Sequence, residues 1–201
     1  LSAISHAAEL LAEEQRDATR VRLTRIIGDN TQRLNRLVAE VLELGRRDRA
    51  LPELLNLKVF IETFLDEYAV HDPRVTEVVA LTADPGAMLW FDRSHLNRVL
   101  WNLVGNALRH GNCEPGGIRL EVRRVLAPVT PARTELHVTD DGPGIEPALQ
   151  AQVFEPFFTT HSSGTGLGLY IVRELCEANG AQLEFCENAP GAHFCLTGKG
   201  E

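Results

Sequence analysis

The stretch that decides the expected fold is Asn102-Leu-Val-Gly-Asn106-Ala-Leu-Arg109-His110. Asn102 and Asn106 are four residues apart, so a helix places both amides on one face, with Arg109 on the next turn. The opposite stripe is apolar and predicts burial against a sheet; it consists of Leu96, Val99, Leu100, Leu103 and Ala107. An amide oxygen suits magnesium and a nearby cation suits phosphate. Taken alone, however, the stretch is explained better by a solvated helix face that carries two amides.

A second motif, Val138-Thr-Asp140-Asp-Gly142-Pro-Gly144-Ile145, lies at the end of an expected strand. The carboxylate of Asp140 can accept a hydrogen bond from an exocyclic amine such as that of adenine. Gly142 and Gly144 let the backbone turn sharply and pass close to a flat ring. Taken alone, the motif also fits an ordinary Asp-Gly-Pro-Gly turn.

A third motif, Gly164-Thr165-Gly166-Leu167-Gly168-Leu169, opens a helix expected over residues 166–179. A glycine-rich turn there presents unpaired N–H groups and the positive end of the helix dipole, which suits phosphates. The motif follows a long loop near the C-terminus rather than an early strand, which excludes a dinucleotide-binding Rossmann fold. The loop carries three phenylalanines within residues 154–158 and is either a lid over a ligand or an ordinary packed loop.

The composition is that of a globular protein: 201 residues, 44% hydrophobic and 24% charged. This length suits one domain of about 150 residues with an appendage, or two small domains. The net charge of −8 argues against a nucleic-acid surface, which needs clustered cations. No apolar run approaches the roughly 20 residues that span a bilayer, and no secretory signal is present, so we expect a cytosolic segment without membrane contact of its own.

The four cysteines give no metal prediction, because none has the Cys/His spacing of a zinc motif. Cys186 and Cys195 are candidates for a bridge across a hairpin. In a reduced cytosol, inert packing residues are the simpler expectation for all four.

The expected elements mix helices and strands without regular βαβ alternation. Helices are expected over 59–68, from a cap at Asp92 to about His110, and over 166–179; strands are expected over 75–81, 118–125, 135–139, 183–187 and 193–196. The fold class is therefore α+β, with a helix layer over a largely antiparallel sheet.

Residues 1–49 are expected to form two helices joined by a turn at 14–19. The second helix carries apolar residues spaced alternately by four and three, from Leu23 to Leu44 and interrupted by Asn30, which predicts a helix-bundle seam. Pro52 marks the boundary between this hairpin and a second unit over 52–201.

The order and spacing of the motifs resemble the histidine-kinase branch of the ATPase/kinase superfamily shared with gyrase, Hsp90 and the mismatch-repair ATPases. Residues 102–109 resemble its N box, 140–144 its first glycine box, 154–158 its F box and 164–169 its second glycine box. The resemblance implies a Bergerat-type α/β sandwich, preceded by an α-helical hairpin, that binds ATP with Mg²⁺.

The resemblance also implies a set of nucleotide-binding residues: Asn102, Asn106, Arg109, His110, Asp140, Gly142, Gly144, Ile145, Thr165, Gly166, Leu167, Gly168 and Leu169. Within it, Asn106 is the magnesium ligand, Arg109 meets phosphate and Asp140 binds the adenine amine. The backbone around Gly166 and Gly168 would hold the phosphates. No side chain is assigned as catalytic, and the roles of His110 and His161 stay open.

The implied activity is transfer of the ATP γ-phosphate to a histidine and then to an aspartate on a response-regulator receiver domain. The run Phe-Phe-Thr-Thr-His followed by Gly-Thr-Gly-Leu-Gly-Leu-Tyr is most similar to nitrogen-regulatory and type IV pilus-regulatory sensor kinases. Leu1-Ser2-Ala3-Ile4 resembles the residues that follow the family's phosphoacceptor motif, so the acceptor is expected upstream of Leu1 rather than at His6. This chain is accordingly expected not to label itself and to form only a weak homodimer through the hairpin.

Two alternatives share the fold: a hydrolytic ATPase, and a nucleotide-binding scaffold without kinase activity. The hydrolytic relatives carry Glu at the position of Asn102, where the carboxylate activates water. Because Asn cannot accept that proton, Asn102 favours the kinase. The intact Asn106, Asp140 and glycine boxes argue against a scaffold.

Overall fold

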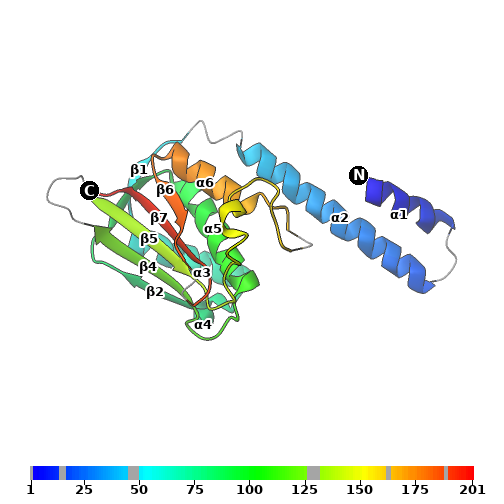
Figure 1. Ribbon diagram of the computed structural model, residues 1–201, viewed down its shortest axis with the longest axis horizontal. Coiled ribbons are helices and arrows are strands. Elements are labelled where there is room, and N and C mark those ends of the chain that lie inside the picture. The colour runs from blue at the N-terminus through cyan, green and yellow to red at the C-terminus, as the bar shows by residue number, and fades with distance from the viewer. Residues whose placement is uncertain (1, 14–16, 45–49, 126–131, 162–163, 188–189) are drawn as a thin grey trace.

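The computed structural model describes residues 2–13, 17–44, 50–125, 132–161, 164–187 and 190–201 (Figure 1). Its elements, in order, are α1 (Ser2–Glu13), α2 (Asp17–Leu44), β1 (Glu53–Asn56), α3 (Leu57–His71), α4 (Val75–Val78), β2 (Val79–Ala83), β3 (Met88–Phe91), α5 (Arg93–His110), β4 (Ile118–Val125), β5 (Arg133–Thr139), a short 3₁₀ helix (Gln150–Gln152), α6 (Gly168–Ala178), β6 (Gln182–Phe185) and β7 (His193–Lys199). The α+β class with an N-terminal helical hairpin is confirmed.

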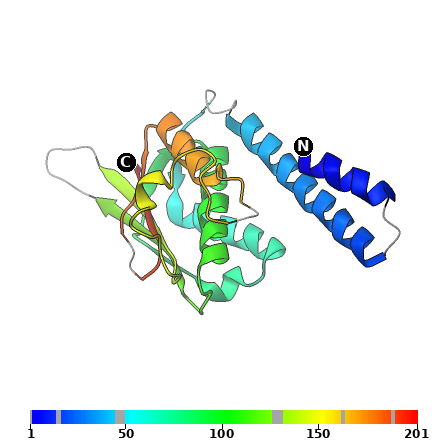
Figure 2. The same cartoon turned by 45° about the vertical axis from the view of Figure 1, so that its right-hand side comes forward.

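A five-stranded sheet of order β2-β4-β5-β7-β6 forms the centre of the fold. Only the β2–β4 pair is parallel within this sheet, so it is mixed and largely antiparallel, as predicted. Strands β1 and β3 form a separate antiparallel ribbon. Figure 2 shows α3, α5 and α6 together on one side of the five-stranded sheet, which gives a two-layer sandwich.

Helix α5 forms as its sequence predicts. The five residues of its apolar stripe are at most 3% exposed and lie in the core between the helices and the sheet. Asp92 caps the helix, because its Oδ1 accepts hydrogen bonds from the backbone N–H groups of Ser94 at 2.8 Å and His95 at 3.1 Å. The cap fixes the residue at which α5 begins. It therefore also fixes the side of the helix on which Asn102 and Asn106 lie.

The structure differs from the predicted elements in two places. The strand expected over 75–81 begins only at Val79, because Val75–Val78 form the helical turn α4. Asp72 starts that turn by accepting from the backbone and the guanidinium of Arg74, and the buried Val75 and Val78 have the i, i+3 spacing of a helix. The four-residue strands β1 and β3 were not predicted at all.

The candidate bridge between Cys186 and Cys195 does not form; both thiols are free, in line with the simpler expectation of unbridged cysteines. The β6–β7 register pairs Cys195 with Glu184, and the Cys186 N–H donates to the His193 carbonyl at 2.8 Å. The two cysteines are therefore offset along the hairpin rather than opposite each other.

Helices α1 and α2 pack together through buried side chains that include Ala7 and Leu23. Asn30 lies in the predicted seam and donates from Nδ2 to the Ile26 carbonyl at 2.8 Å, within its own helix. Leu37 packs against the core of the α/β sandwich. Residues 17–19 of the turn predicted over 14–19 belong to α2, which begins at Asp17, and residues 14–16 lie outside the described part of the chain. The side chains of Val41 and Leu44 also lie outside it.

The boundary between the hairpin and the sandwich stays a prediction, because residues 45–49 also lie outside the described part of the chain. Among the described helices, none is both long and apolar enough to cross a bilayer.

Replacing the α5 cap tests how much this helix start contributes to stability. Burial raises the pKa of Asp92, but hydrogen bonds from Ser94, Leu51 and His95 outweigh it and bring the pKa to about 2. Asp92→Ala should lower the free energy of unfolding by about 1–2 kcal/mol at pH 7, measured by urea denaturation. Because the folded-state pKa is lowered, this difference is present above about pH 4 and is lost as the pH falls towards 2.

Asp66→Ala, at an exposed position of α3, is the matched control and should change stability little at any pH. A stability loss in Asp92→Ala that is equally large at pH 7 and pH 2.5 would contradict the capping account.

Candidate functional site

A cavity of about 490 Å³ opens at the end of β5, and it is lined by α5, by loop residues within 143–161 and 164–166, and by the start of α6. This volume lies in the range of small-molecule sites. The structure brings residues from all three sequence motifs to its wall. The predicted site residues all line the cavity except Gly142 and Leu167.

Asp140 lies in the floor of this cavity and is only 6% exposed. Its Oδ1 accepts backbone hydrogen bonds from Gly142 at 2.9 Å and Ala192 at 3.1 Å. Burial raises the pKa of Asp140 and nearby Asp141 adds to this, whereas the two backbone hydrogen bonds and His110 act in the opposite direction. The carboxylate is thus held rigidly by Oδ1 and can accept a ligand hydrogen bond at the cavity floor.

The backbone around Asp140 is locked to the start of β7. The Asp140 N–H donates to the Ala192 carbonyl at 3.1 Å, and the Gly191 N–H donates to the Asp140 carbonyl at 3.0 Å. A Cβ on Gly191 would clash with the Asp140 carboxylate and with the Gly142 nitrogen at 2.6 Å, so only glycine fits there. Gly142 is buried beneath the carboxylate, which explains why it holds Asp140 without lining the cavity.

The two amides on α5 have different partners. Asn102 donates from Nδ2 to the Arg98 carbonyl at 2.9 Å, and a Cβ on Gly168 would lie 2.9 Å from its Oδ1, so this oxygen faces the start of α6. Asn106 accepts at Oδ1 from Arg109 Nη1 at 3.0 Å. Both residues are half-buried and line the cavity, as the helix spacing predicted.

The glycine-rich turn places the start of α6 on the cavity wall. Gly166 has φ +74°, and a Cβ there would clash with the Phe157 carbonyl group, so the turn requires glycine. The helix begins with a hydrogen bond from the Ile171 N–H to the Leu167 carbonyl at 2.8 Å. The amides of this first turn have no partner within the helix and suit an anion. Leu167 contributes backbone only, because its side chain is 2% exposed and packs in the core.

His110 and His161 face each other at the cavity wall, with ring centroids 6.1 Å apart. Loss of solvation lowers the pKa of His110, Arg109 and His161 lower it further, and Asp140 opposes this. The lowered pKa favours the neutral form of His110.

The three phenylalanines of the loop take different positions. Phe158 lines the cavity, and Phe154 packs against Phe194 with ring centroids 6.1 Å apart. Phe157 is 69% exposed and has φ +67°, a strained conformation for a residue with a side chain. The loop is thus packed at two of its three aromatic positions.

Sequence reasoning missed Asp141. Its carboxylate accepts three backbone hydrogen bonds, from Asn112 at 2.8 Å, Cys113 at 3.2 Å and Glu114 at 3.0 Å. Burial raises its pKa, but these bonds outweigh burial and lower the pKa overall. Asp141 therefore ties the loop that follows α5 to the end of β5, and the only sequence signal was its place beside Asp140.

Several apolar wall residues were not among the predicted site residues, because apolar side chains carry no chemical signal of a site in the sequence. They include Leu149, Val153, Ala192 and Phe194. They make the cavity suitable for a flat apolar ring at the end where Asp140 offers a hydrogen-bond acceptor.

A buried acid at a strand end, amides on a helix and a glycine turn at a helix start thus share one cavity in this α/β sandwich. Residues 91–199, more than half the chain, match the model of the histidine kinase-, DNA gyrase B- and HSP90-like ATPase family. The chain belongs to this family. The relatives that it resembles include sensor histidine kinases.

The chain is 42% identical over 197 residues to sensor protein kinase PilS of Pseudomonas aeruginosa, covering 95% of this chain and 36% of that protein. It is 31% identical over 201 residues to sensor histidine kinase ZraS of Klebsiella oxytoca, covering 98% of this chain and 42% of that protein. The chain thus spans less than half the length of these curated relatives.

Solved structures support the same fold. The mycobacterial sensor histidine kinase MprB aligns with a TM-score of 0.58 at 28% identity, covering 75% of this chain and 99% of that one. Histidine kinase AdeS of Acinetobacter baumannii aligns with a TM-score of 0.67, covering 98% of this chain and 93% of that one. At 19% identity, the second likeness concerns the fold alone.

Proposed function

We propose that this chain is the ATP-binding kinase part of a two-component sensor histidine kinase. It would bind ATP with Mg²⁺ and direct the γ-phosphate to a histidine, from which a response-regulator receiver domain takes it onto an aspartate. The observation that carries this proposal is the shared cavity. Buried Asp140, the amide of Asn106 and the start of α6 face one space large enough for a nucleotide.

Each group has a separate task in this proposal. The Asp140 carboxylate accepts a hydrogen bond from the adenine amine, and the amides at the start of α6 hold phosphate oxygens. Asn106 offers its Oδ1 to magnesium, which means that Arg109 must exchange this oxygen for a phosphate. Phosphoryl transfer needs little covalent chemistry from the protein, so positioning and charge stabilisation suffice.

Asn102 favours transfer over hydrolysis. Its amide nitrogen is already bonded to the Arg98 carbonyl, and an amide oxygen cannot take a proton from water at neutral pH. No general base therefore stands where the hydrolytic members of the superfamily carry Glu. ATP hydrolysis would need a general base elsewhere in the cavity. His110 is the group to test for that role, because its lowered pKa favours the neutral form.

The helical hairpin fits a role in pairing two copies of the chain. We assign residues 52–201 to the ATP-binding unit and 1–49 to part of a dimerisation hairpin. Apolar side chains on α1 and α2 are exposed in the single chain: Leu10 by 45%, Val21 by 71% and Val38 by 57%. A second copy would cover such residues in a helical bundle, and the assembly would lie in the cytosol, where ATP and receiver domains are available.

Magnesium dependence should reside in Asn106. Asn106→Ala removes the amide oxygen, so added Mg²⁺ should no longer raise the affinity for ATP, while metal-free ADP binding stays nearly unchanged. Calorimetric titrations with and without Mg²⁺ measure both. Asn97→Ala, on the same helix but outside the cavity, is the control. A full magnesium response in the Asn106 variant would rule out this assignment.

The transfer reaction itself can be tested with γ-labelled ATP and a separate helical hairpin that carries the acceptor histidine of a related sensor kinase. We expect acid-labile label on that hairpin, lost with Asn106→Ala, and onward transfer to a receiver domain. Free phosphate without labelled hairpin would support the hydrolytic alternative. Nucleotide binding with neither product would support a scaffold.

A further inference from the structure

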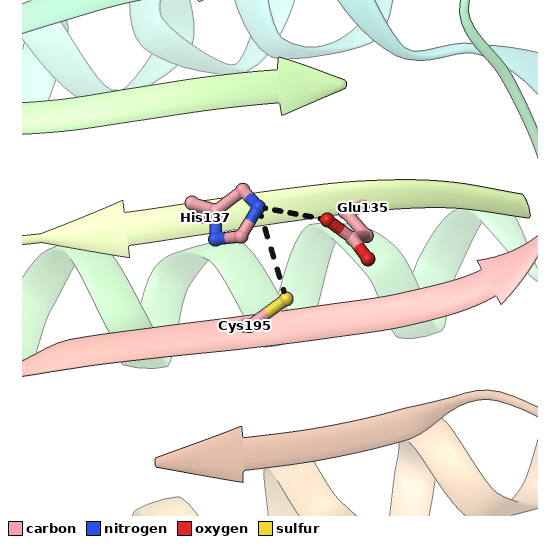
Figure 3. A group of neighbouring side chains, drawn as sticks. All are labelled: Glu135, His137 and Cys195. Atoms are coloured by element: carbon pink, nitrogen blue, oxygen red, sulfur yellow. Dashed lines mark hydrogen bonds and ion pairs between the residues drawn. The ribbon is translucent and has the colours of Figure 1, made fainter. Parts of the chain in front are cut away.

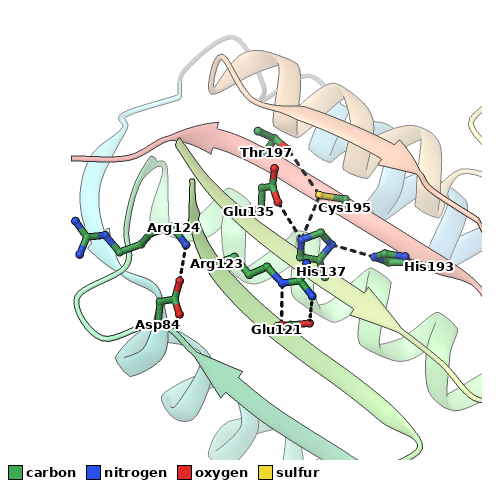
Figure 4. A network of polar contacts seen from close by, with 9 residues as sticks. All are labelled: Asp84, Glu121, Arg123, Arg124, Glu135, His137, His193, Cys195 and Thr197. Atoms are coloured by element: carbon green, nitrogen blue, oxygen red, sulfur yellow. Dashed lines mark hydrogen bonds and ion pairs between the residues drawn. The ribbon is translucent and has the colours of Figure 1, made fainter. Parts of the chain in front are cut away.

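The face of the five-stranded sheet that points away from the helices carries a cluster of polar and sulfur side chains (Figure 4). Side chains alternate along a strand, so Leu136 of β5 and Leu196 of β7 face the core while their neighbours face outward. The outward neighbours include Glu135, His137 and Cys195. None of these three takes part in the nucleotide site.

These three side chains bring an oxygen, a nitrogen and a sulfur close together (Figure 3). His137 Nε2 lies 3.1 Å from Glu135 Oε2 and 4.0 Å from Cys195 Sγ, and the three atoms all lie within 4.8 Å of one another. Around a tetrahedral zinc ion, such donor atoms are separated by about 3.4–3.6 Å. Small side-chain rotations therefore suffice to surround one ion.

The backbone that carries these groups is rigid. His137 and Cys195 are directly paired in the β5–β7 register, and Glu135 is the next outward residue on β5. Cys195 is only 7% exposed, and the side chains of His137 and Glu135 are 12% and 28% exposed. Such a site loses little conformational entropy on binding, because its donors are already held in place.

His193 supplies the orienting contact that metal-binding histidines need. Its Nε2 lies 2.9 Å from His137 Nδ1, so the pair can share a proton with His137 Nδ1–H as donor. Without a metal ion, His137 Nε2 carries a proton and donates it to Glu135 at 3.1 Å. On metal binding this proton leaves to solvent, and the Nδ1–H tautomer then presents the Nε2 lone pair to the ion. Metal-bound histidines are commonly fixed by such a contact at the second ring nitrogen.

The surrounding charges also favour a cation. Glu121 is paired with His137 across the β4–β5 register, and Glu184 is paired with Cys195 across β6–β7. Arg123 is paired with Glu135 across the β4–β5 register, and it donates hydrogen bonds of 2.8 and 2.7 Å to Glu121. Its charge is therefore balanced within the cluster.

We propose that Glu135, His137 and Cys195 form a binding site for one zinc-type divalent ion, with His193 as the orienting partner. A thiolate, an imidazole and a carboxylate together select zinc-like metals over magnesium or calcium, which prefer oxygen alone. On binding, the sulfur–metal bond forms and the Cys195 thiol proton passes to solvent. The fourth position is taken by water.

Such an ion would link β5 to β7 on the face opposite the nucleotide. Asp140 follows β5 and Ala192 precedes β7, and these two residues are hydrogen-bonded to each other in the cavity floor. The ion would therefore stabilise the same pair of strands that positions Asp140.

The test is a calorimetric titration of the reduced, chelator-treated chain with Zn²⁺, followed by cobalt substitution. We expect one ion per chain and a thiolate-to-cobalt charge-transfer band, which Cys195→Ser should abolish. His193→Gln removes only the orienting contact and should weaken Zn²⁺ binding about 10-fold. His137→Gln and Glu135→Gln each remove a ligand and should weaken it more than His193→Gln does.

Cys113→Ser is the matched thiol control and should bind Zn²⁺ as the parent does. Nucleotide titration of each variant shows whether it is folded, and His137→Gln keeps the test valid if Cys195→Ser does not fold. The proposal is overturned if the cobalt band survives in folded Cys195→Ser, or if folded His137→Gln binds Zn²⁺ within threefold of the parent.

Discussion

The rest of the structure depends on how the Asp140 carboxylate is held in the cavity floor. A buried carboxylate is costly unless its oxygens are hydrogen-bonded, and here two backbone amides bond Oδ1. This arrangement requires a glycine at 191, because a side chain there would occupy the position of the carboxylate. It also fixes the end of β5 against the start of β7, and Asp141 then ties the loop after α5 to the same point. The hydrogen-bonded carboxylate of Asp140 thus helps to hold β5, β7 and α5 in the positions that form the cavity.

The sheet uses its two faces differently. Its helix-covered face and strand ends form the cavity for the nucleotide, whereas its outward face gathers acids, histidines and thiols that helices leave uncovered (Figure 4). Strands β5 and β7 contribute to both, because alternate residues of a strand point to opposite faces. His137 on the outward face lies only three positions before Asp140 in the sequence. A ligand on the outward face would therefore bind close to the residue that forms the cavity floor.

The sequence predicts best where a short motif decides the structure. Local spacing predicts the cap at Asp92, the buried stripe of α5 and strand β4. The three motifs supply most of the polar residues that line the cavity. It fails where tertiary contacts decide. The four-residue strands β1 and β3 are too short for a periodic signal, and the helical turn α4 depends on Asp72 pairing with Arg74. The His137–Cys195 contact joins residues 58 positions apart and depends on strand register, so no spacing rule could reveal it.

The most direct test of the central claim is the affinity of Asp140→Asn for ATP and ADP, measured by calorimetry beside the parent chain. The asparagine Oδ1 can still accept from Gly142 and Ala192, so the cavity floor is kept, while the charge offered to the adenine amine is lost. Loss of a charge-assisted hydrogen bond corresponds to about 1.5–3 kcal/mol, or about 10- to 150-fold weaker binding, and it should affect both nucleotides alike because both carry adenine. Affinities for both that stay within twofold of the parent would contradict the account.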